Sequence, residues 1–320
     1  MEIRGKSLTD PQRPYIIAEA SGNHNQDRHQ ARKLVQAAAL TGADAIKFQT
    51  FTAEEICADV PILFGHDVAH DGWCCNLGVT RMRELFQKGG LPRVWHRDLQ
   101  QEAEDLGLAF LSTPFSLDAA KFLVEEVGVQ GLKIASGDIT FVPLLEYAGR
   151  TGLPTIMSTG SSTIREVQEA INAIDRGWEV GQWEDDPLVV LHCLSIYPCS
   201  QRDINLASIR FLRDRICYPV GLSDHTLSTD LVPAMAVACG AVCFEKHLRL
   251  ASDTFSVDAA HSLNPSQFRR YVEVIREAVE ILGTGSKEPH PLEAHERLWS
   301  RRDPSDWLRP TKEARQGSWE

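Results

Sequence analysis

Short apolar stretches alternate with amphipathic stretches along most of the chain. Eight stretches have the length and composition of buried strands: YIIAEA (15–20), DAIKFQT (44–50), LAFLST (108–113), GLKIAS (131–136), PTIMST (154–159), LVVLHCLS (188–195), PVGLSD (219–224) and AVCFEKHL (241–248). Helical periodicity separates them, and this alternation predicts a parallel sheet. Eight strands are the number that closes an α/β (β/α)8 TIM barrel. An open doubly wound sheet is the alternative, although no GxGxxG follows the first strand.

Two of the predicted helices have clear boundaries in the sequence. Thr163 and Glu166 have the spacing of a capping box at the start of one helix. Asn264-Pro265 places an N-cap residue before a proline at the first helical position of the other. Gly283 follows the last apolar position of that second helix and is expected to end it.

Two regions interrupt the alternation of strands and helices. Residues 51–91 form a long connection after the second predicted strand, and long connections in compact domains usually carry function. The polar tail after Gly285 is too short for an independent domain, yet it contains Trp299, Trp307 and Trp319. We therefore expect a barrel domain over 1–285 and a tail over 286–320 that packs on its own barrel or on that of a partner.

Composition excludes several classes of protein. The 320 residues carry a formal net charge of −11, which argues against a general nucleic-acid-binding surface. The N-terminus has no apolar segment of a secretory signal, and the longest apolar run, LVPAMAVACGAVCF, is shorter than the ~20 residues of a membrane span. None of the eight cysteines forms a CxxC motif, which fits a reduced, cytoplasmic location. Cys74 and Cys75 are expected to be free thiols in a loop.

Polar residues gather at the ends of the predicted strands, where (β/α)8 enzymes carry their chemistry. In chain order these residues are Glu19, Lys47, Gln49, Thr113, Lys133, Ser136, Ser158, His192, Ser195, Tyr197, Ser223, His225, Glu245 and His247. Lys47 and Lys133 are expected near the barrel interior, where an unpaired ammonium is costly, so both need an anion. Ser136, Ser158 and Ser223 add hydroxyls and helix-start N–H groups, which indicates a pocket for phosphate or for phosphate plus carboxylate.

A metal site is indicated by two histidines on neighbouring strands. His225 and His247 lie at the ends of the seventh and eighth predicted strands and can converge. With Glu245 or Asp258 nearby, two imidazoles suit Mn²⁺, Zn²⁺, Fe²⁺ or Co²⁺ better than Mg²⁺ or Ca²⁺. Glu245 and His247 share one face of their strand, whereas Lys246 faces the other way and is expected to form a structural ion pair.

The strand-end motifs resemble those of the sialic acid (N-acetylneuraminate) synthase family. The matching pieces, in order, are AEASGNHNQD, GADAIKFQTF, FLSTPF, KIASGD, MSTG, HCLSIYP, GLSDHT and FEKH, and the resemblance extends from about Tyr15 to Gly285. The resemblance implies a (β/α)8 barrel and a homodimer. It also implies that the enzyme condenses phosphoenolpyruvate with an N-acetylated amino sugar in its aldehyde form. The products are a 2-keto acid and phosphate. A divalent metal is required, and we expect Mn²⁺ ahead of Mg²⁺, Co²⁺ or Zn²⁺.

The resemblance also implies roles for individual residues. The phosphoenolpyruvate site comprises Lys47, Thr113, Lys133, Ser136, Ser158 and Ser223. The sugar site comprises Glu19, Gln49, Tyr197 and Asp258, together with Ser195, and the metal ligands are His225, His247 and, as a further candidate, Glu245. Glu19 is the expected group that orients or deprotonates a water. Lys47, Lys133, Tyr197 and Asp258 complete the expected catalytic set.

The sequence departs from the family on the sugar side. We expect no antifreeze-like domain after the barrel. Ser195 stands where the family often has asparagine, and FSVDAAHSL lacks the common Gly-Pro before Asp258. In the family the antifreeze-like domain reaches over the partner's barrel as a lid on the sugar site, and Trp307 and Arg309 of the tail are candidates to replace part of that lid. We therefore expect conserved donor chemistry with a changed aldehyde acceptor. One alternative is an aldolase or lyase on the same barrel with a different aldehyde substrate, which uses either a metal or a Schiff-base amine from Lys47 or Lys133. Another is a non-catalytic sugar-phosphate-binding protein.

Overall fold

The computed structural model describes residues 1–61, 80–181, 188–250 and 256–317. Cys74, Cys75 and Trp319 lie outside the described residues. The chain divides into two units, Met1–Ile281 and Leu282–Glu320. Among the described residues, no helix is both long enough and apolar enough to cross a membrane.

All eight predicted strands are present in the first unit. They are β3 (Tyr15–Glu19), β4 (Ala45–Thr50), β5 (Ala109–Pro114), β6 (Leu132–Ile134), β7 (Thr155–Ser158), β8 (Leu188–Cys193), β9 (Val220–Asp224) and β10 (Cys243–His247). The hydrogen-bonded order is β5-β4-β3-β10-β9-β8-β7-β6, and the paired strands run parallel. The end strands β5 and β6 contact each other, so the sheet closes into the predicted (β/α)8 barrel.

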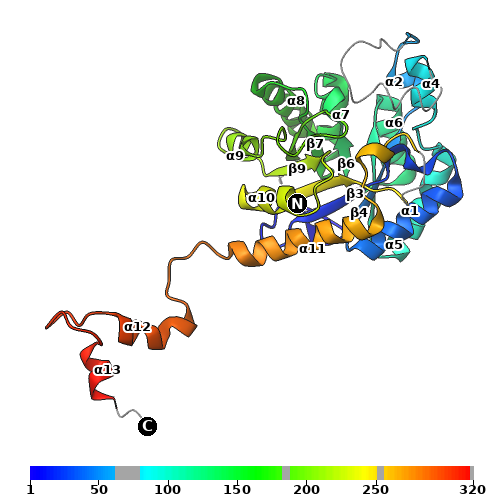
Figure 1. Ribbon diagram of the computed structural model, residues 1–320. Coiled ribbons are helices and arrows are strands. Elements are labelled where there is room, and N and C mark those ends of the chain that lie inside the picture. The colour runs from blue at the N-terminus through cyan, green and yellow to red at the C-terminus, as the bar shows by residue number, and fades with distance from the viewer. Residues whose placement is uncertain (62–79, 182–187, 251–255, 318–320) are drawn as a thin grey trace. The chain divides into compact units, whose positions relative to one another are not determined.

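Helices surround the strands on the outside of the barrel (Figure 1). They are α1 (Arg28–Thr41), α5 (His96–Asp105), α6 (Leu117–Lys121), α7 (Val142–Thr151), α8 (Ile164–Gly181), α9 (Ala207–Arg213), α10 (Leu231–Ala238) and α11 (Pro265–Leu282). The predicted boundaries of α8 and α11 are confirmed. Thr163 and Glu166 exchange capping hydrogen bonds at the start of α8, and the Asn264 side chain accepts from the Gln267 N–H at the start of α11.

A two-stranded hairpin packs against the barrel strands. The sequence pattern did not predict this hairpin. It consists of β1 (Glu2–Ile3) and β2 (Lys6–Ser7). The hairpin side chain Ile3 and the following Leu8 are buried in one cluster with Tyr15, Ile17 and Leu191 from the strands. Strands of two residues have no periodic signal, so only the fold reveals that this segment completes the core.

The interior of the barrel changes from apolar to polar along the strands. Alternate strand residues face inward, and from the start to the middle of the strands they are apolar, as in Tyr15 and Ile17 of β3 and Val189 and Leu191 of β8. Gly221 of β9 lies in this apolar part of the barrel. A Cβ added there would lie 2.1 Å from the Cys243 carbonyl oxygen, so position 221 has no room for a side chain. Two residues further along β9 the inward position is Ser223, which is buried among charged groups. The chemistry is therefore confined to the C-terminal end of the barrel.

The long connection and the tail contain short helices of their own. The connection includes α2 (Ala53–Ile56) and α4 (Met82–Gln87), which contact each other. The second unit contains α12 (Ala294–Ser300) and α13 (Lys312–Gln316). Within that unit Asp303 accepts hydrogen bonds from Ser305 and from the Lys312 N–H, which holds the turn between the two helices. The expectation that the tail packs on a barrel stays a prediction.

Candidate active site

Two adjoining cavities lie at the C-terminal ends of the strands. The first, here the lysine cavity, has a volume of about 70 Å³, and its lining includes all six residues expected to bind phosphoenolpyruvate: Lys47, Thr113, Lys133, Ser136, Ser158 and Ser223. The second, here the aromatic cavity, has a volume of about 300 Å³ and is lined in part by Phe51, Phe86 and Tyr197. Gln49, Tyr197 and His247 line both cavities, so a molecule in one can meet a molecule in the other.

Strand register places charged groups side by side in the lysine cavity. Glu19 of β3 is the register partner of Lys47 on one side and of His247 on the other. Lys47 Nζ lies 2.7 Å from Glu19 Oε2 and 3.6 Å from Glu245 Oε2. Lys133 Nζ lies 3.9 Å from Glu245 Oε1. All four side chains are buried, and each lysine faces a carboxylate of this chain, so part of the anionic charge that the two ammonium groups need comes from Glu19 and Glu245.

Hydroxyl groups complete the lining of the lysine cavity. Lys47 donates to Thr113 Oγ1 at 2.9 Å, and Lys133 donates to Ser158 Oγ at 2.6 Å. The Ser223 hydroxyl donates to Glu245 Oε1 at 3.3 Å. Ser136 Oγ accepts a hydrogen bond from the Gly160 N–H at 2.9 Å. The cavity therefore offers two ammonium groups and several rotatable hydroxyls, which is a suitable donor set for phosphate and carboxylate oxygens.

Burial and charge pairing shift the pKa values of the two carboxylates in opposite directions. Burial raises the pKa of Glu19 to about 7, although the Lys47 ammonium acts against this rise. Burial acts to raise the pKa of Glu245 as well, but the positive charges of Lys133 and Lys47 have a larger effect. The pKa of Glu245 is therefore lowered. Glu245 is therefore ionised near neutral pH, whereas Glu19 exists in both protonation states, as suits a group that exchanges a proton.

The two lysines also differ from each other. Burial acts to lower the pKa of Lys47, but Glu19 and Glu245 raise it overall. Burial lowers the pKa of Lys133, and Glu245 compensates only in part. Lys47 is thus the more firmly charged of the two.

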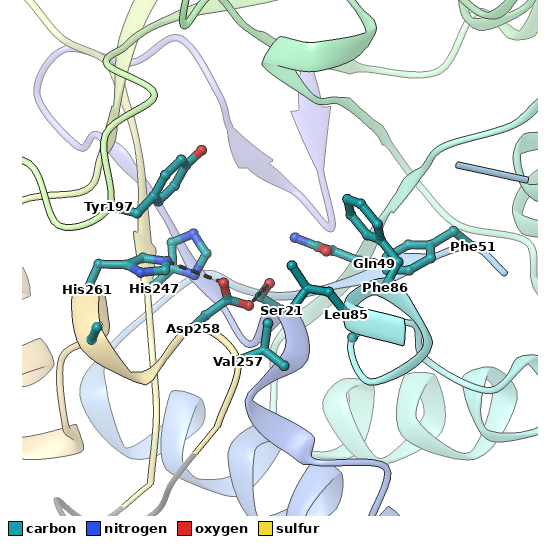
Figure 2. A pocket seen from close by; sticks show the side chains of 12 residues that line it. Ser21, Gln49, Phe51, Leu85, Phe86, Tyr197, His247, Val257, Asp258 and His261 are labelled. Atoms are coloured by element: carbon teal, nitrogen blue, oxygen red, sulfur yellow. Dashed lines mark hydrogen bonds and ion pairs between the residues drawn. The ribbon is translucent and has the colours of Figure 1, made fainter. Parts of the chain in front are cut away.

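A cluster suited to a metal ion lies beside the lysine cavity. His247, Asp258 and His261 each offer a ligand atom, and these atoms lie within 4.8 Å of one another. Asp258 Oδ2 accepts hydrogen bonds from the Ser21 hydroxyl at 2.5 Å and from the Gly22 N–H at 3.1 Å, and its Oδ1 lies 3.5 Å from His261 Nε2. Figure 2 shows the three side chains converging on one side of the aromatic cavity. The carboxylate is thus oriented toward the imidazoles by backbone and hydroxyl donors from the β3 side.

The chemistry of these ligands fits a divalent cation. Burial and the neighbouring His261 and His225 lower the pKa of His247 well below its usual value, so the ring is neutral. Among the described residues, the buried Nδ1 of His247 has no hydrogen-bond partner. A neutral imidazole with an unused nitrogen beside a carboxylate is the form in which histidine binds a metal.

The metal cluster differs in part from the set expected from the sequence. His247 belongs to it, whereas His261 was missed, although it follows Asp258 by three residues in DAAH. His225 lies beside the cluster, with its ring centroid 5.5 Å from that of His247, and its Nδ1 contacts the Leu194 carbonyl oxygen at 2.8 Å. Glu245 faces the two lysines instead. The assignment of His225 and Glu245 as ligands stays a prediction.

The remaining expected residues occupy three kinds of position. Gln49 donates to Glu19 Oε1 at 3.2 Å between the two cavities, and the Tyr197 ring packs 4.2 Å from that of His225. Ser195 is not among the described residues that line either cavity. Lys246 is fully buried on the other face of β10, 3.5 Å from Asp224 Oδ2, and forms the expected structural ion pair.

Comparison with known proteins agrees with this geometry. Residues 34–287 match the NeuB family. The N,N'-diacetyllegionaminic acid synthase of Legionella pneumophila is 38% identical over 301 residues, which cover 93% of this chain and 80% of the relative. The pseudaminic acid synthase of Helicobacter pylori is 35% identical over 281 residues, covering 87% and 77%. The crystal structure of N-acetylneuraminic acid (sialic acid) synthetase from Leptospira borgpetersenii, in complex with citrate, superposes with a TM-score of 0.79 at 30% identity, covering 92% and 94%.

The fold and the paired cavities define a (β/α)8 barrel with a buried cavity that contains two lysines, beside a candidate metal site. The chain belongs to the NeuB family. It is a phosphoenolpyruvate-dependent synthase that forms a carbon–carbon bond with an amino sugar to give a nonulosonic acid. This activity excludes the alternative that the chain is a non-catalytic sugar-phosphate-binding protein.

Proposed function

We propose that the lysine cavity holds phosphoenolpyruvate and that the aromatic cavity holds the amino sugar in its open aldehyde form. The observation that carries this proposal is that both cavities share Gln49, Tyr197 and His247. A donor bound to the lysines would therefore meet an acceptor at this boundary. Holding two substrates in this relation lowers the entropic barrier to their reaction.

The donor would be held by Lys47, Lys133 and the hydroxyls around them. Lys47 keeps a positive charge because Glu19 and Glu245 raise its pKa. Phosphate and carboxylate oxygens can accept from the Thr113 and Ser158 hydroxyls, which already contact the two ammonium groups. C3 of phosphoenolpyruvate attacks the aldehyde carbon and forms the new C–C bond, and the aldehyde oxygen takes up a proton to become a hydroxyl.

Glu19 is the group proposed to act on water. Water adds to C2 as the new C–C bond forms, which gives a tetrahedral carbon. The bond from C2 to the phosphate oxygen then breaks, the hydroxyl from water loses its proton to become the keto oxygen, and phosphate leaves. The ionised form of Glu19 can accept the proton of that water, and Lys47 at 2.7 Å stabilises this form. Gln49 donates to the other carboxylate oxygen and so fixes the orientation of Glu19.

His247, Asp258 and His261 are the residues proposed to hold the divalent metal that the family uses. A bound cation would supply Lewis-acid polarisation of the aldehyde oxygen. Two imidazoles and one carboxylate suit Mn²⁺, which we propose as the native ion, with Mg²⁺, Co²⁺ and Zn²⁺ as substitutes. Asp258 is oriented for this role by Ser21 and the Gly22 N–H, which occupy its other oxygen.

The proposal includes a homodimer in a reducing compartment. Support for the dimer comes from the family resemblance and from the tail unit, where Leu292, Trp307 and Leu308 are exposed apolar side chains of the kind found at interfaces. The six cysteines of the described residues are free, which supports a cytoplasmic location.

Release of phosphate from phosphoenolpyruvate tests the proposed function. The full chain, loaded with Mn²⁺, is assayed with a panel of N-acetylated amino sugars and with smaller aldehydes lacking nitrogen. We expect release that requires both an amino sugar and the metal, and that stops when a chelator removes the metal. Release with the smaller aldehydes alone, or none with any acceptor, would contradict the proposal.

A Schiff-base aldolase would need Lys133 to act as a nucleophilic amine. Burial lowers the pKa of Lys133, which would make its amine more nucleophilic. Lys133 Nζ is nevertheless engaged by Ser158, by the Ile134 carbonyl and by Glu245. Reduction with borohydride in the presence of either substrate should therefore trap no covalent adduct, whereas an adduct at Lys133 would support the aldolase.

A further inference from the structure

The buried side chain of Asn23 joins the two segments that carry the proposed metal ligands. Asn23 lies in the short 3₁₀ helix η1 (Ser21–His24), which follows β3. Its Nδ2 donates to the Leu248 carbonyl oxygen at 2.8 Å and to Ser262 Oγ at 2.9 Å. Its Oδ1 accepts from the Ser256 hydroxyl at 2.6 Å. One amide therefore contacts the end of β10 and two points of the segment that follows this strand.

Each contact of Asn23 lies close in sequence to a residue of the metal cluster. Leu248 directly follows His247, Ser262 directly follows His261, and Ser256 precedes Asp258 by two residues. The Ser262 hydroxyl also donates to the Asp258 carbonyl oxygen at 2.5 Å. Strand pairing positions His247, whereas Asp258 and His261 lie beyond the last strand, at η5 (Ala259–His261). The distance of these two ligands from His247 therefore depends on contacts such as those of Asn23.

An amide is chemically suited to this position because it has both donors and an acceptor. The Leu248 carbonyl oxygen can only accept, so the nitrogen of Asn23 must face it, and the oxygen then faces Ser256. Ser262 accepts from the amide and uses its own proton for the Asp258 carbonyl. An aspartate of the same shape would lack both donors, and an apolar residue would leave buried polar groups without partners.

The position of Asn23 indicates an action through the ligands and not on the substrates. Asn23 is not among the described residues that line either cavity. The Leu263 N–H donates to the His247 carbonyl oxygen at 2.9 Å, so the two segments are also joined through their backbones. From these contacts we infer that Asn23 is a positioning residue, which fixes the spacing of His247, Asp258 and His261 and thereby sets the affinity for the divalent metal. This inference rests on the metal site of the proposed function.

Titration of Mn²⁺ into the metal-free full chain, followed by calorimetry, tests the inference without relying on activity. Asn23→Ala should weaken Mn²⁺ binding by about 10–100-fold, the usual effect of removing a group that orients metal ligands. Ser256→Ala is the milder variant: it removes one of the three hydrogen bonds of Asn23 and should weaken Mn²⁺ binding by about threefold. At saturating Mn²⁺, the KM for phosphoenolpyruvate should stay at the wild-type value in both variants, because Asn23 and Ser256 do not line the lysine cavity.

A buried hydroxyl elsewhere in the barrel provides the matched control. The Thr50 hydroxyl bonds to His96 Nε2 and to Ser112 Oγ, each at 2.7 Å. Thr50→Val should therefore lower the melting temperature, as Asn23→Ala does, but leave Mn²⁺ affinity unchanged.

The outcomes separate the inference from the proposed metal site. If Thr50→Val weakens Mn²⁺ binding as much as Asn23→Ala does, the inference is wrong. If Asn23→Ala does not fold, wild-type affinity in Ser256→Ala would overturn the inference. Weaker binding in His261→Ala together with wild-type affinity in Asn23→Ala would also overturn it and leave the metal site standing. Wild-type affinity in both His261→Ala and Asn23→Ala would overturn the proposed metal site as well.

Discussion

The lysine cavity and the aromatic cavity share three residues but are built in different ways. The lysine cavity is lined by strand ends, whose relative positions are set by backbone hydrogen bonds, as in the Glu19–Lys47 register. The aromatic cavity takes Leu85 and Phe86 from a connection and Val257 and Asp258 from the segment after β10. Rigid strands suit chemistry that is common to a family, whereas connections can change without disturbing the barrel. The comparison teaches that donor binding and acceptor choice can be altered separately.

The largest effect is expected from Glu19→Gln in the lysine cavity. Glutamine keeps an oxygen for the hydrogen bond from Gln49 but cannot take a proton from water. We expect kcat to fall by about 10²–10⁴-fold, the usual range for loss of a general base. Steady-state phosphate release measures the change. A kcat within threefold of the wild type would show that Glu19 is not the proton acceptor.

Lys133→Met tests the other side of the same cavity. It removes an ammonium group that contacts Ser158 and faces Glu245, so kcat/KM for phosphoenolpyruvate should fall by about 10²–10³-fold. The KM for the acceptor should change little, because Lys133 does not line the aromatic cavity. Since Glu245 loses a partner, a thermal melt should accompany the kinetics. Equal rises in both KM values would contradict the separation of the two cavities.

The metal ligands can be resolved by three single substitutions. His247→Ala and His261→Ala should each weaken Mn²⁺ binding by at least about 100-fold, since each removes a direct ligand. His225→Ala should weaken it less, because His225 lies outside the cluster. Titration of Mn²⁺ into the metal-free protein, followed by calorimetry, measures the affinities. A larger loss for His225→Ala than for His261→Ala would favour the pair expected from the sequence.

Removal of the tail after Gly285 tests whether the second unit takes part in acceptor binding. If Trp307 and Arg309 serve as part of a lid, the acceptor KM should rise by roughly tenfold, equal to ~1.4 kcal/mol, with the KM for phosphoenolpyruvate unchanged. Phosphate release at varied acceptor concentration gives both constants. An unchanged acceptor KM would limit the tail to packing or assembly.

The last prediction concerns stability in acid rather than catalysis. Burial lowers the pKa of His96 to about 4, and its Nε2 bonds to the Thr50 hydroxyl at 2.7 Å. The unfolded chain binds the proton near pH 6.5, so the stability contributed by neutral His96 is complete above that pH and is lost as the pH falls toward 4. His96→Gln should remove roughly 1–3 kcal/mol of this acid dependence, as measured by urea unfolding at pH 7 and pH 5. An identical pH dependence in the variant would assign it to other groups.

The sequence was most informative where periodic patterns repeat. All eight strands and the caps of α8 and α11 could be predicted, because burial, turn residues and capping residues agree at each element. All six residues expected to bind phosphoenolpyruvate line one cavity, because the C-terminal ends of parallel strands must meet. The hairpin at Glu2–Ser7 was missed, because two-residue strands have no period.

Side-chain pairing could not be predicted from the pattern alone. The contacts of Lys47 and Lys133 with Glu19 and Glu245 depend on the stagger between strands, which the sequence does not specify. His261 lies in a short turn after Asp258, where no strand or helix period marks its direction. The approach of Leu85 and Phe86 to the cavity depends on the path of a long connection without periodicity. Acceptor specificity was therefore the least predictable part of the site.

A crystal structure of the full chain with phosphoenolpyruvate and Mn²⁺ would test the central claim most directly. We predict that the phosphate and carboxylate of the donor lie in the lysine cavity, within hydrogen-bond distance of Lys47 and Lys133. We also predict that the anomalous signal of manganese lies among His247, Asp258 and His261. Phosphoenolpyruvate bound against Phe51 and Phe86 in the aromatic cavity, or manganese bound by Glu245 between the lysines, would contradict the account.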